Sequence, residues 1–122
     1  MSKKILVADD EEYLIKFIKR YLERRGVEVI ATPKGTDVLP ILEREEIDLV
    51  FLDIQFEDIG GLEILKEIKK KHTGVKVIII TGVKNTSLEP EARSLGADGF
   101  ISKPVVSEEF NEAIQAFLPL DK

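Results

Sequence analysis

The sequence predicts an α/β fold in which an open sheet of five parallel strands is covered by helices on both faces. Short, β-branched, apolar segments recur along the 122 residues, at 4–8, 27–31, 47–53, 75–81 and 99–102. Each is apolar in a continuous run, as strands buried on both faces should be. Stretches with helical spacing separate these segments, and strands joined by helical crossovers must run parallel.

Helical stretches follow the predicted strands in order. After the first strand one helix face is apolar, and Arg25-Gly26 supplies a basic end and a glycine stop. That face has the i, i+3, i+4, i+7, i+8 spacing, with Leu14, Phe17, Ile18, Tyr21 and Leu22. The next three helices are less regular and are expected at roughly 36–44, 61–71 and 88–95.

The last predicted helix is regular again. Ser107 is its expected N-cap, and Pro119 lies beyond its end. Its apolar face consists of Phe110, Ala113, Ile114, Phe117 and Leu118. Nothing along the chain resembles a linker, a repeat or a low-complexity segment, so we expect one domain over residues 1–122. The closing "LPLDK" favours a protein that consists of this domain alone.

The composition excludes several classes of function. A net charge of −5 argues against nucleic acid as a direct partner, because phosphate contact needs a surplus of Lys and Arg. The absence of cysteine excludes disulfides, thiolate chemistry and zinc knuckles, and it fits a reducing cytoplasm. The apolar runs are too short to cross a membrane, and the N-terminus is not a signal peptide. We therefore expect a cytoplasmic protein with no membrane contact.

Polar side chains mark the ends of four predicted strands. Asp9 and Asp10 close the first strand and Asp53 closes the third, while Thr81 and Lys103 close the fourth and fifth. Open parallel sheets bind ligands at this carboxyl edge. Any one such acid could simply solvate a loop or cap a helix. Together, carboxylates gathered at a low-dielectric edge require a cation, and a hard divalent ion such as Mg²⁺, or Mn²⁺ in its place, suits oxygen ligands.

The chain resembles a known family in four segments that sit at these strand ends, "ILVADDE", "DLVFLDI", "VIIITG" and "GADGFISKPV". They are similar to the signature segments of response-regulator receiver domains, the CheY-like phospho-acceptor modules of two-component signalling. The resemblance extends from Lys3 to about Leu118. It implies a flavodoxin-like, doubly wound (βα)5 fold with strand order 2-1-3-4-5.

The resemblance also implies a signalling domain that catalyses only its own phosphorylation and dephosphorylation. Its phosphoryl donor would be a histidine kinase or a histidine phosphotransfer protein. Its target would be a downstream protein that the sequence does not name, and it would act as a monomer or as a phosphorylation-dependent dimer.

Site roles follow from the same resemblance. Asp53 is implied to be the phospho-acceptor, with Asp10 a direct Mg²⁺ ligand and Asp9 a ligand acting largely through water. The backbone carbonyl of Gln55 would complete the protein ligands. Lys103 is implied to pair with the phospho-acceptor.

Further residues are implied to read the phosphoryl group once it is attached. Thr81 would be the switch hydroxyl and Phe100 the switch aromatic, although Phe100 could equally be ordinary core packing. The Thr81 hydroxyl and the Gly82 N–H can donate hydrogen bonds to phosphoryl oxygens. The bond from Lys103 to Pro104 is often cis in this family.

The sequence departs from the family pattern in four places. Phe56-Glu57 replaces the usual Met-Pro pair, so the loop loses the rigid turn that Pro gives. The switch aromatic is Phe100 where Tyr is usual, and Pro90 predicts a short or late fourth helix. Val83 is apolar, so it cannot orient the water that hydrolyses an acyl phosphate, whereas Gln55 can. We therefore expect a slow decay of the phosphorylated state.

Other residues of this region are expected to have simpler roles. Glu57 and Asp58 are predicted to be exposed loop charges, His72 a solvated residue at a helix end, and Gly61 a residue that serves backbone geometry.

Rival functions fit less well. A Mg²⁺-dependent phosphohydrolase of the haloacid-dehalogenase type places two aspartates two residues apart after its first strand, whereas Asp10 is followed by Glu11 and Glu12. A flavodoxin-like cofactor carrier needs Gly, Ser and Thr amides there to bind phosphate, and Asp9 and Asp10 would repel that phosphate. A domain excised from a longer regulator or hybrid kinase remains an alternative.

Overall fold

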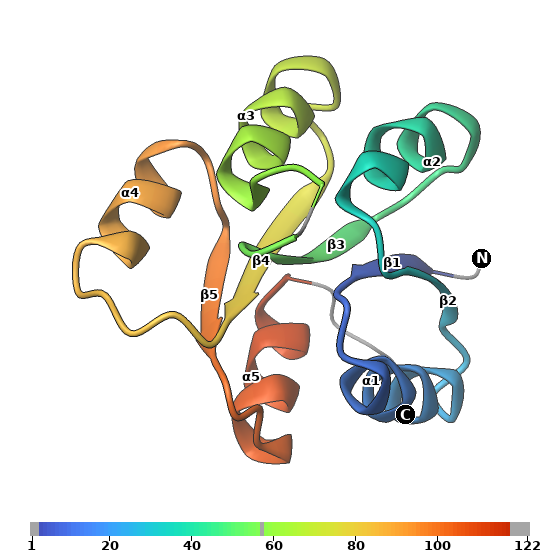
Figure 1. Ribbon diagram of the computed structural model, residues 1–122. Helices are drawn as coiled ribbons and strands as arrows, with labels where there is room; N and C mark the ends of the chain where they lie inside the picture. The colour runs from blue at the N-terminus through green and yellow to red at the C-terminus, as the bar shows by residue number, and fades with distance from the viewer. Residues whose placement is uncertain (1–2, 57, 118–122) are drawn as a thin grey trace.

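A computed structural model describes residues 3–56 and 58–117 and confirms the parallel sheet (Figure 1). All neighbouring strands pair in parallel, in the order β2-β1-β3-β4-β5. The strands are β1 Lys4–Ala8, β2 Glu28–Thr32, β3 Leu49–Asp53, β4 Lys76–Thr81 and β5 Gly99–Ser102. The predicted strand order is therefore confirmed, and β1 and β3 lie side by side at its centre.

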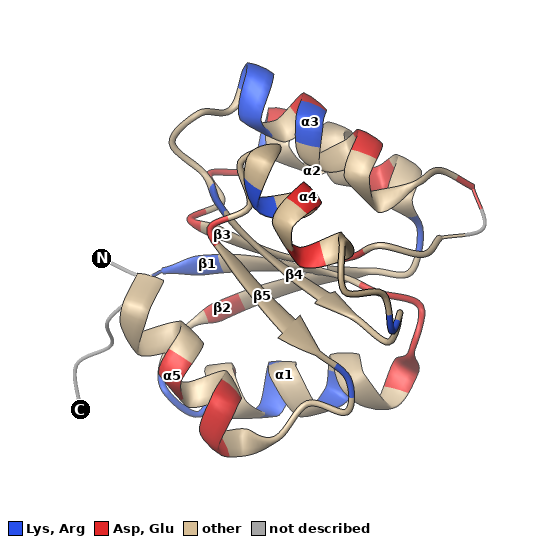
Figure 2. Ribbon diagram, turned by 90° about the vertical axis from the view of Figure 1, so that its left-hand side faces the viewer, with Lys and Arg blue, Asp and Glu red and all other residues tan. Residues whose placement is uncertain are grey.

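Helices cover both faces of this sheet, as Figure 2 shows. Those of the described residues are α1 Glu12–Glu23, α2 Val38–Arg44, α3 Gly61–Lys71, α4 Leu88–Ser94 and α5 Ser107–Phe117, and a 3₁₀ turn at Gly35–Asp37 precedes α2. Helices α1 and α5 pack on one face, and α2, α3 and α4 pack on the other. None of the helices in the described part of the chain has the length and apolar character that crossing a bilayer requires.

Alternate residues of each strand supply the two cores. In β1, Ile5 and Val7 pack with α1 and α5, while Leu6 and Ala8 pack with α2, α3 and α4. Burying an aliphatic side chain of this size contributes roughly 1.5–3 kcal/mol. The parallel register pairs Ala8 with Leu52 and Thr81 with Ser102, so the strands end at one edge and the polar residues beyond them lie there together.

The predicted end of α1 is confirmed, whereas the predicted start of α5 is not. Gly26 has a φ of 82° and ends α1, with the Val27 N–H donating to the Leu22 carbonyl over 3.1 Å. The predicted N-cap at Ser107 is wrong, because Ser107 is already helical and the carbonyl of Val106 accepts the first helical bond.

Other predictions for the helices have mixed outcomes. Leu118 and Pro119, predicted for the end of α5, lie outside the described residues, as does Glu57. The predicted short fourth helix is confirmed, with Pro90 in its first turn. His72 is not simply solvated, because its Nε2 lies 3.0 Å from an oxygen of Glu43 on α2 and only 19% of its side chain is exposed.

A partly buried ion pair between Lys69 and Asp98 holds the far edge of the sheet. Asp98 accepts hydrogen bonds from the Val77 N–H over 2.9 Å and from Lys69 Nζ over 2.7 Å. Burial alone would raise the pKa of Asp98, but these donors hold it below its ordinary value. The negative charge of Asp98 is therefore balanced by these donors, in contrast to the charges of Asp9 and Asp53 at the opposite edge.

Candidate phospho-acceptor site at the carboxyl edge of the sheet

The carboxyl edge of the sheet brings the predicted acids together, because β1 and β3 are neighbours. One carboxylate oxygen from each of Asp9, Asp10 and Asp53 lies within 4.8 Å of the others. Asp9 and Asp53 are buried and Asp10 is exposed. A cleft of 280 Å³ opens over them and is lined by Asp10, Glu11, Asp53, Gln55, Gly82 and Lys103.

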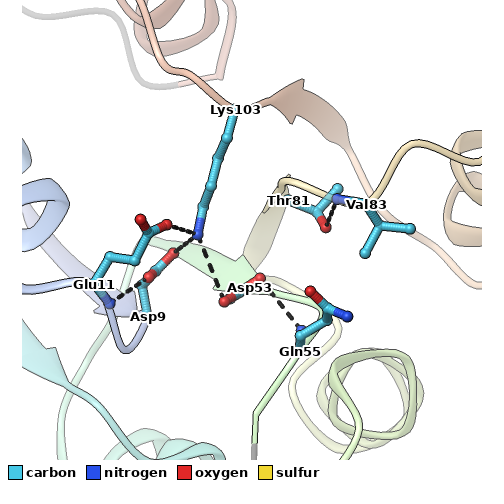
Figure 3. Close-up of polar contacts among 7 residues, drawn as sticks. All are labelled: Asp9, Glu11, Asp53, Gln55, Thr81, Val83 and Lys103. Atoms are coloured by element: carbon cyan, nitrogen blue, oxygen red, sulfur yellow. Dashed lines mark hydrogen bonds and ion pairs between the residues drawn. The ribbon is translucent and has the colours of Figure 1, made fainter.

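Asp53 is the most perturbed acid of the site. Only 4% of the residue is exposed, and its Oδ1 accepts one hydrogen bond, from the Gln55 N–H over 3.3 Å. Burial raises the pKa of Asp53 to about 6, and the nearby charge of Asp9 adds to the increase. Its other oxygen, Oδ2, lies 3.7 Å from Lys103 Nζ (Figure 3). The negative charge of this carboxylate is therefore only partly balanced by its neighbours, so a cation or an electrophile would interact with it favourably.

Asp9 is buried with one oxygen unsatisfied. Its Oδ1 accepts the Glu11 N–H over 2.8 Å. Its Oδ2 lies 3.0 Å from Lys103 Nζ as an ion pair, but it accepts no well-aligned hydrogen bond from any described residue. Burial raises the pKa of Asp9 as well. An orphaned buried oxygen is a feature that a bound cation would satisfy.

Lys103 is shared among three carboxylates. Its Nζ contacts Glu11 and Asp9 and lies further from Asp53, and only 14% of its side chain is exposed (Figure 3). Burial alone would lower the pKa of Lys103, but these carboxylates together hold it above its ordinary value. The contact of Lys103 with Glu11 was not predicted, although Glu11 follows Asp9 by two residues at the same edge. The expected cis bond between Lys103 and Pro104 is present.

The predicted switch residues lie on β4 and β5. Thr81 is fully buried, and its Oγ1 accepts the Val83 N–H over 3.0 Å, so its hydroxyl oxygen is engaged with its own loop (Figure 3). Phe100 is partly buried and packs against the core on the α2, α3 and α4 side. Gly82 lies at the cleft, next to the Lys103 side chain.

The two predicted lifetime-tuning residues flank the cleft. Gln55 is exposed and Val83 is partly exposed, and Figure 3 shows them following Asp53 and Thr81 respectively. The amide side chain of Gln55 lies near Asp53 in this view. Its position is compatible with orienting a water, whereas Val83 offers no polar side-chain atom.

Gly61 fixes the approach of α3 to the end of β3. A Cβ at this position would lie 2.3 Å from the Asp53 carbonyl oxygen and 2.6 Å from Ile54 Cα. The Gly61 N–H also donates to the Ile54 carbonyl over 2.8 Å. The expected backbone role of Gly61 is therefore confirmed, and the helix packs directly against the end of β3.

The donor set suits a hard divalent cation. Every candidate ligand offers oxygen, the cluster contains no soft sulfur or imidazole donor, and Asp9 Oδ2 lacks a hydrogen-bond partner among the described residues. Mg²⁺ prefers one or two carboxylates and retains several waters, and the exposed Asp10 and open cleft leave room for them. Asp9, Asp10 and Asp53 fit this ion.

A parallel sheet whose carboxyl edge holds three clustered aspartates and a facing lysine defines a class of signalling domains. The chain belongs to the response regulator receiver domain family, whose family model matches residues 5–115. It is thus a signalling domain of two-component response regulators, as the four signature segments implied.

Relatives and solved structures agree with this membership. Sporulation initiation phosphotransferase F of Bacillus subtilis is 31% identical over 120 residues, with coverage of 98% of this chain and 97% of that protein. The alkaline phosphatase synthesis transcriptional regulatory protein PhoP of the same organism is 32% identical over 97% of this chain, which spans only 49% of that longer protein. A CheY-like receiver domain from Methanospirillum hungatei superimposes with a TM-score of 0.89 at 31% identity, with coverage of 95% of this chain and 93% of that one.

Proposed function

We propose that the protein accepts a phosphoryl group on Asp53 from a histidine kinase or a histidine phosphotransfer protein. An Asp53 carboxylate oxygen attacks the phosphorus, the phosphorus–nitrogen bond of the donor breaks, and the imidazole takes the electron pair. The product is an acyl phosphate on Asp53. The observation that carries the proposal is the buried, under-compensated Asp53 carboxylate facing Lys103 at the floor of an open cleft.

Charge neutralisation is the main requirement of this transfer, because an anionic nucleophile must approach an anionic donor. Mg²⁺, held by Asp9, Asp10, Asp53 and the backbone carbonyl of Gln55, would offset the negative charge of the carboxylates and of the phosphoryl group. Lys103 supplies a second positive charge at the same place.

Hydrogen-bond donors then stabilise the phosphoryl oxygens. The Gly82 N–H borders the cleft, and the Thr81 hydroxyl can donate once it turns from its own loop. Movement of Thr81 toward the phosphoryl group leaves space into which Phe100 can rotate, which would change the surface of β4 and β5 for a downstream protein.

Intact mass after incubation with acetyl phosphate and Mg²⁺ tests the proposal. The wild type should gain one phosphoryl group, Asp53→Asn should gain none, and Asp10→Ala should gain much less. Asp98→Asn is the matched control, because Asp98 is a partly buried, ion-paired acid at the opposite edge, and it should label fully. Labelling of Asp53→Asn at the wild-type level would refute the site. Sustained release of free phosphate with no accumulation of the phosphorylated protein would instead indicate a phosphohydrolase.

The switch has its own test. With the phosphate mimic beryllofluoride, wild-type backbone NMR shifts should change around Thr81 and Phe100. Thr81→Ala and Lys103→Ala should bind the mimic yet lose much of this change, because both groups read the phosphoryl group after it is attached. A full wild-type shift pattern in either variant would exclude that residue from the switch.

The proposal extends to the whole protein. We propose that residues 1–122 form one receiver domain that acts in the cytoplasm on a protein target, as a monomer or as a phosphorylation-dependent dimer. The near-complete mutual coverage with sporulation initiation phosphotransferase F supports a protein of this size, and the half coverage of PhoP supports the alternative of a longer regulator.

A further inference from the structure

The loop between β3 and α3 is anchored to a turn that precedes α2. Asp58 in this loop accepts hydrogen bonds on Oδ1 from the Gly35 N–H over 3.2 Å and on Oδ2 from the Thr36 N–H over 3.1 Å. The Thr36 hydroxyl donates to the same Oδ2 over 2.8 Å. The Thr36 amide, followed by the hydroxyl and the Gly35 amide, holds the pKa of Asp58 below its ordinary value. Asp58 is exposed as predicted, but it is not a free loop charge.

Apolar contacts reinforce the same junction. A Cβ at Gly35 would lie 2.7 Å from Ile59 Cγ2, 2.9 Å from Ile64 Cδ1 and 3.1 Å from Phe56 Cδ2. Loop side chains on both sides of Asp58 thus fill the space that only a glycine leaves open. The turn before α2 and the loop after β3 therefore pack as one unit.

Both segments, the loop after β3 and the turn before α2, are joined to the acidic site by hydrogen bonds. On the loop side, the Gln55 N–H donates to Asp53 Oδ1. On the turn side, Thr32 donates to Asp37 over 2.7 Å, and the Thr32 carbonyl accepts the Asp9 N–H over 3.1 Å. A cleft of 480 Å³ lined by Asp10, Pro33, Lys34, Thr36 and Asp58 runs between the two sides. Through Asp58, hydrogen bonds therefore link the loop that follows β3 to the turn that Thr32 connects to Asp9 at the end of β1.

We propose that Asp58 is a positioning residue for the cation site. By fixing the loop to Gly35 and Thr36, it restrains the backbone of Gln55, whose carbonyl is the proposed fourth ligand. A tertiary hydrogen-bonded anchor thereby replaces the rigid turn that the family's Pro would give at the preceding position. This inference rests on the proposed function, and it assigns Asp58 no contact with the ion itself.

Direct ion binding tests the inference without any phosphoryl donor. Mn²⁺ affinity is measured by water-proton relaxation, and Mg²⁺ affinity by the shift of the Gln55 amide in NMR titrations. Asp58→Ala should weaken both by about tenfold, the scale found when a group that orients a ligand is removed. In Asp58→Asn the side-chain oxygen can still accept hydrogen bonds from Thr36. The affinity for each ion should therefore fall by less than about threefold relative to the wild type.

Glu63→Ala is the matched control for charge. Glu63 is an exposed acid in the first turn of α3 and makes no ion pair or side-chain hydrogen bond with any described residue. It should change the affinity by less than about twofold, the effect of a distant surface charge screened by solvent. Circular dichroism confirms that each variant is folded.

The outcomes separate this inference from the proposed function. Wild-type affinity in Asp58→Ala, or equal losses in Asp58→Ala, Asp58→Asn and Glu63→Ala, would overturn the anchor and leave phosphorylation of Asp53 standing. Wild-type protein that binds neither Mn²⁺ nor Mg²⁺ would overturn the metal dependence together with the anchor.

Discussion

The Asp53 carboxylate should destabilise the folded protein when no cation is bound. Its pKa of about 6, against an ordinary 3.8, corresponds to about 3 kcal/mol at neutral pH, at about 1.4 kcal/mol per pKa unit. Asp53→Asn removes the charge, keeps the shape and retains an oxygen for the Gln55 N–H. Because the new amide also faces Lys103, we expect a gain of about 1–3 kcal/mol in the free energy of unfolding.

The gain should depend on pH in a defined direction. Above pH 6 the wild-type carboxyl is ionised in both states, so the full difference is present. As the pH falls through about 6 the folded wild type takes up a proton, whereas the unfolded chain does so only near 3.8. The wild type is therefore stabilised relative to Asp53→Asn over this window, and the difference should close by about pH 4.

Urea unfolding in EDTA, followed by circular dichroism from pH 8 to pH 4, measures this difference. Asp98→Asn is the control of opposite sign, because it removes a carboxylate that Lys69 and the Val77 N–H stabilise, and it should cost about 1–3 kcal/mol at neutral pH. Saturating Mg²⁺ should stabilise the wild type far more than Asp53→Asn. An Asp53→Asn protein no more stable than the wild type at pH 8 would refute the reasoning, as would a gain that does not change with pH.

Three further predictions concern the same edge. Phosphoryl lifetime should shorten in Val83→Glu and lengthen in Gln55→Leu, as measured by decay at fixed Mg²⁺; equal rates in all three proteins would show that neither side chain orients the water. Gly61→Ala should lower the free energy of unfolding by about 1–3 kcal/mol, whereas Gly60→Ala, which has open space, should lower it far less; comparable urea midpoints would contradict the close approach. Labelling by acetyl phosphate at subsaturating Mg²⁺ should fall about tenfold from pH 7 to pH 5 as Asp53 protonates, and a flat profile would exclude the raised pKa.

The sheet and its polar edge could be predicted from the sequence because both depend on local patterns. Continuous apolar runs identify buried strands, and in a parallel sheet the residue after each run must lie at one edge. Asp9, Asp53 and Thr81 could therefore be predicted from the sequence to lie together. The closeness of Gly61 to β3 could be anticipated only as a backbone role, because the clash distance depends on how α3 docks.

Contacts that depend on side-chain direction could not be predicted in this way. Glu11 contacts Lys103, which lies 92 residues further along the chain, and the spacing of the acids does not encode that contact. Asp58 meets Thr36 across 22 residues, so its sequence context shows only a charged loop. Ser107 has the chemistry of a cap, yet the helix starts one residue earlier in hydrogen bonding, at the Val106 carbonyl.

The site consists of strand ends and the residues just beyond them, and the outer faces of the helices contribute nothing to it. For example, Lys16 and Arg20 on α1 and Arg24 just after it are exposed and take no part in the acidic cluster. The residues of the proposed reaction and these helix faces are therefore separate parts of the molecule. Substitutions on the exposed face of α1 should leave the acidic cluster intact, so the surface of this domain can be redesigned without disturbing its site.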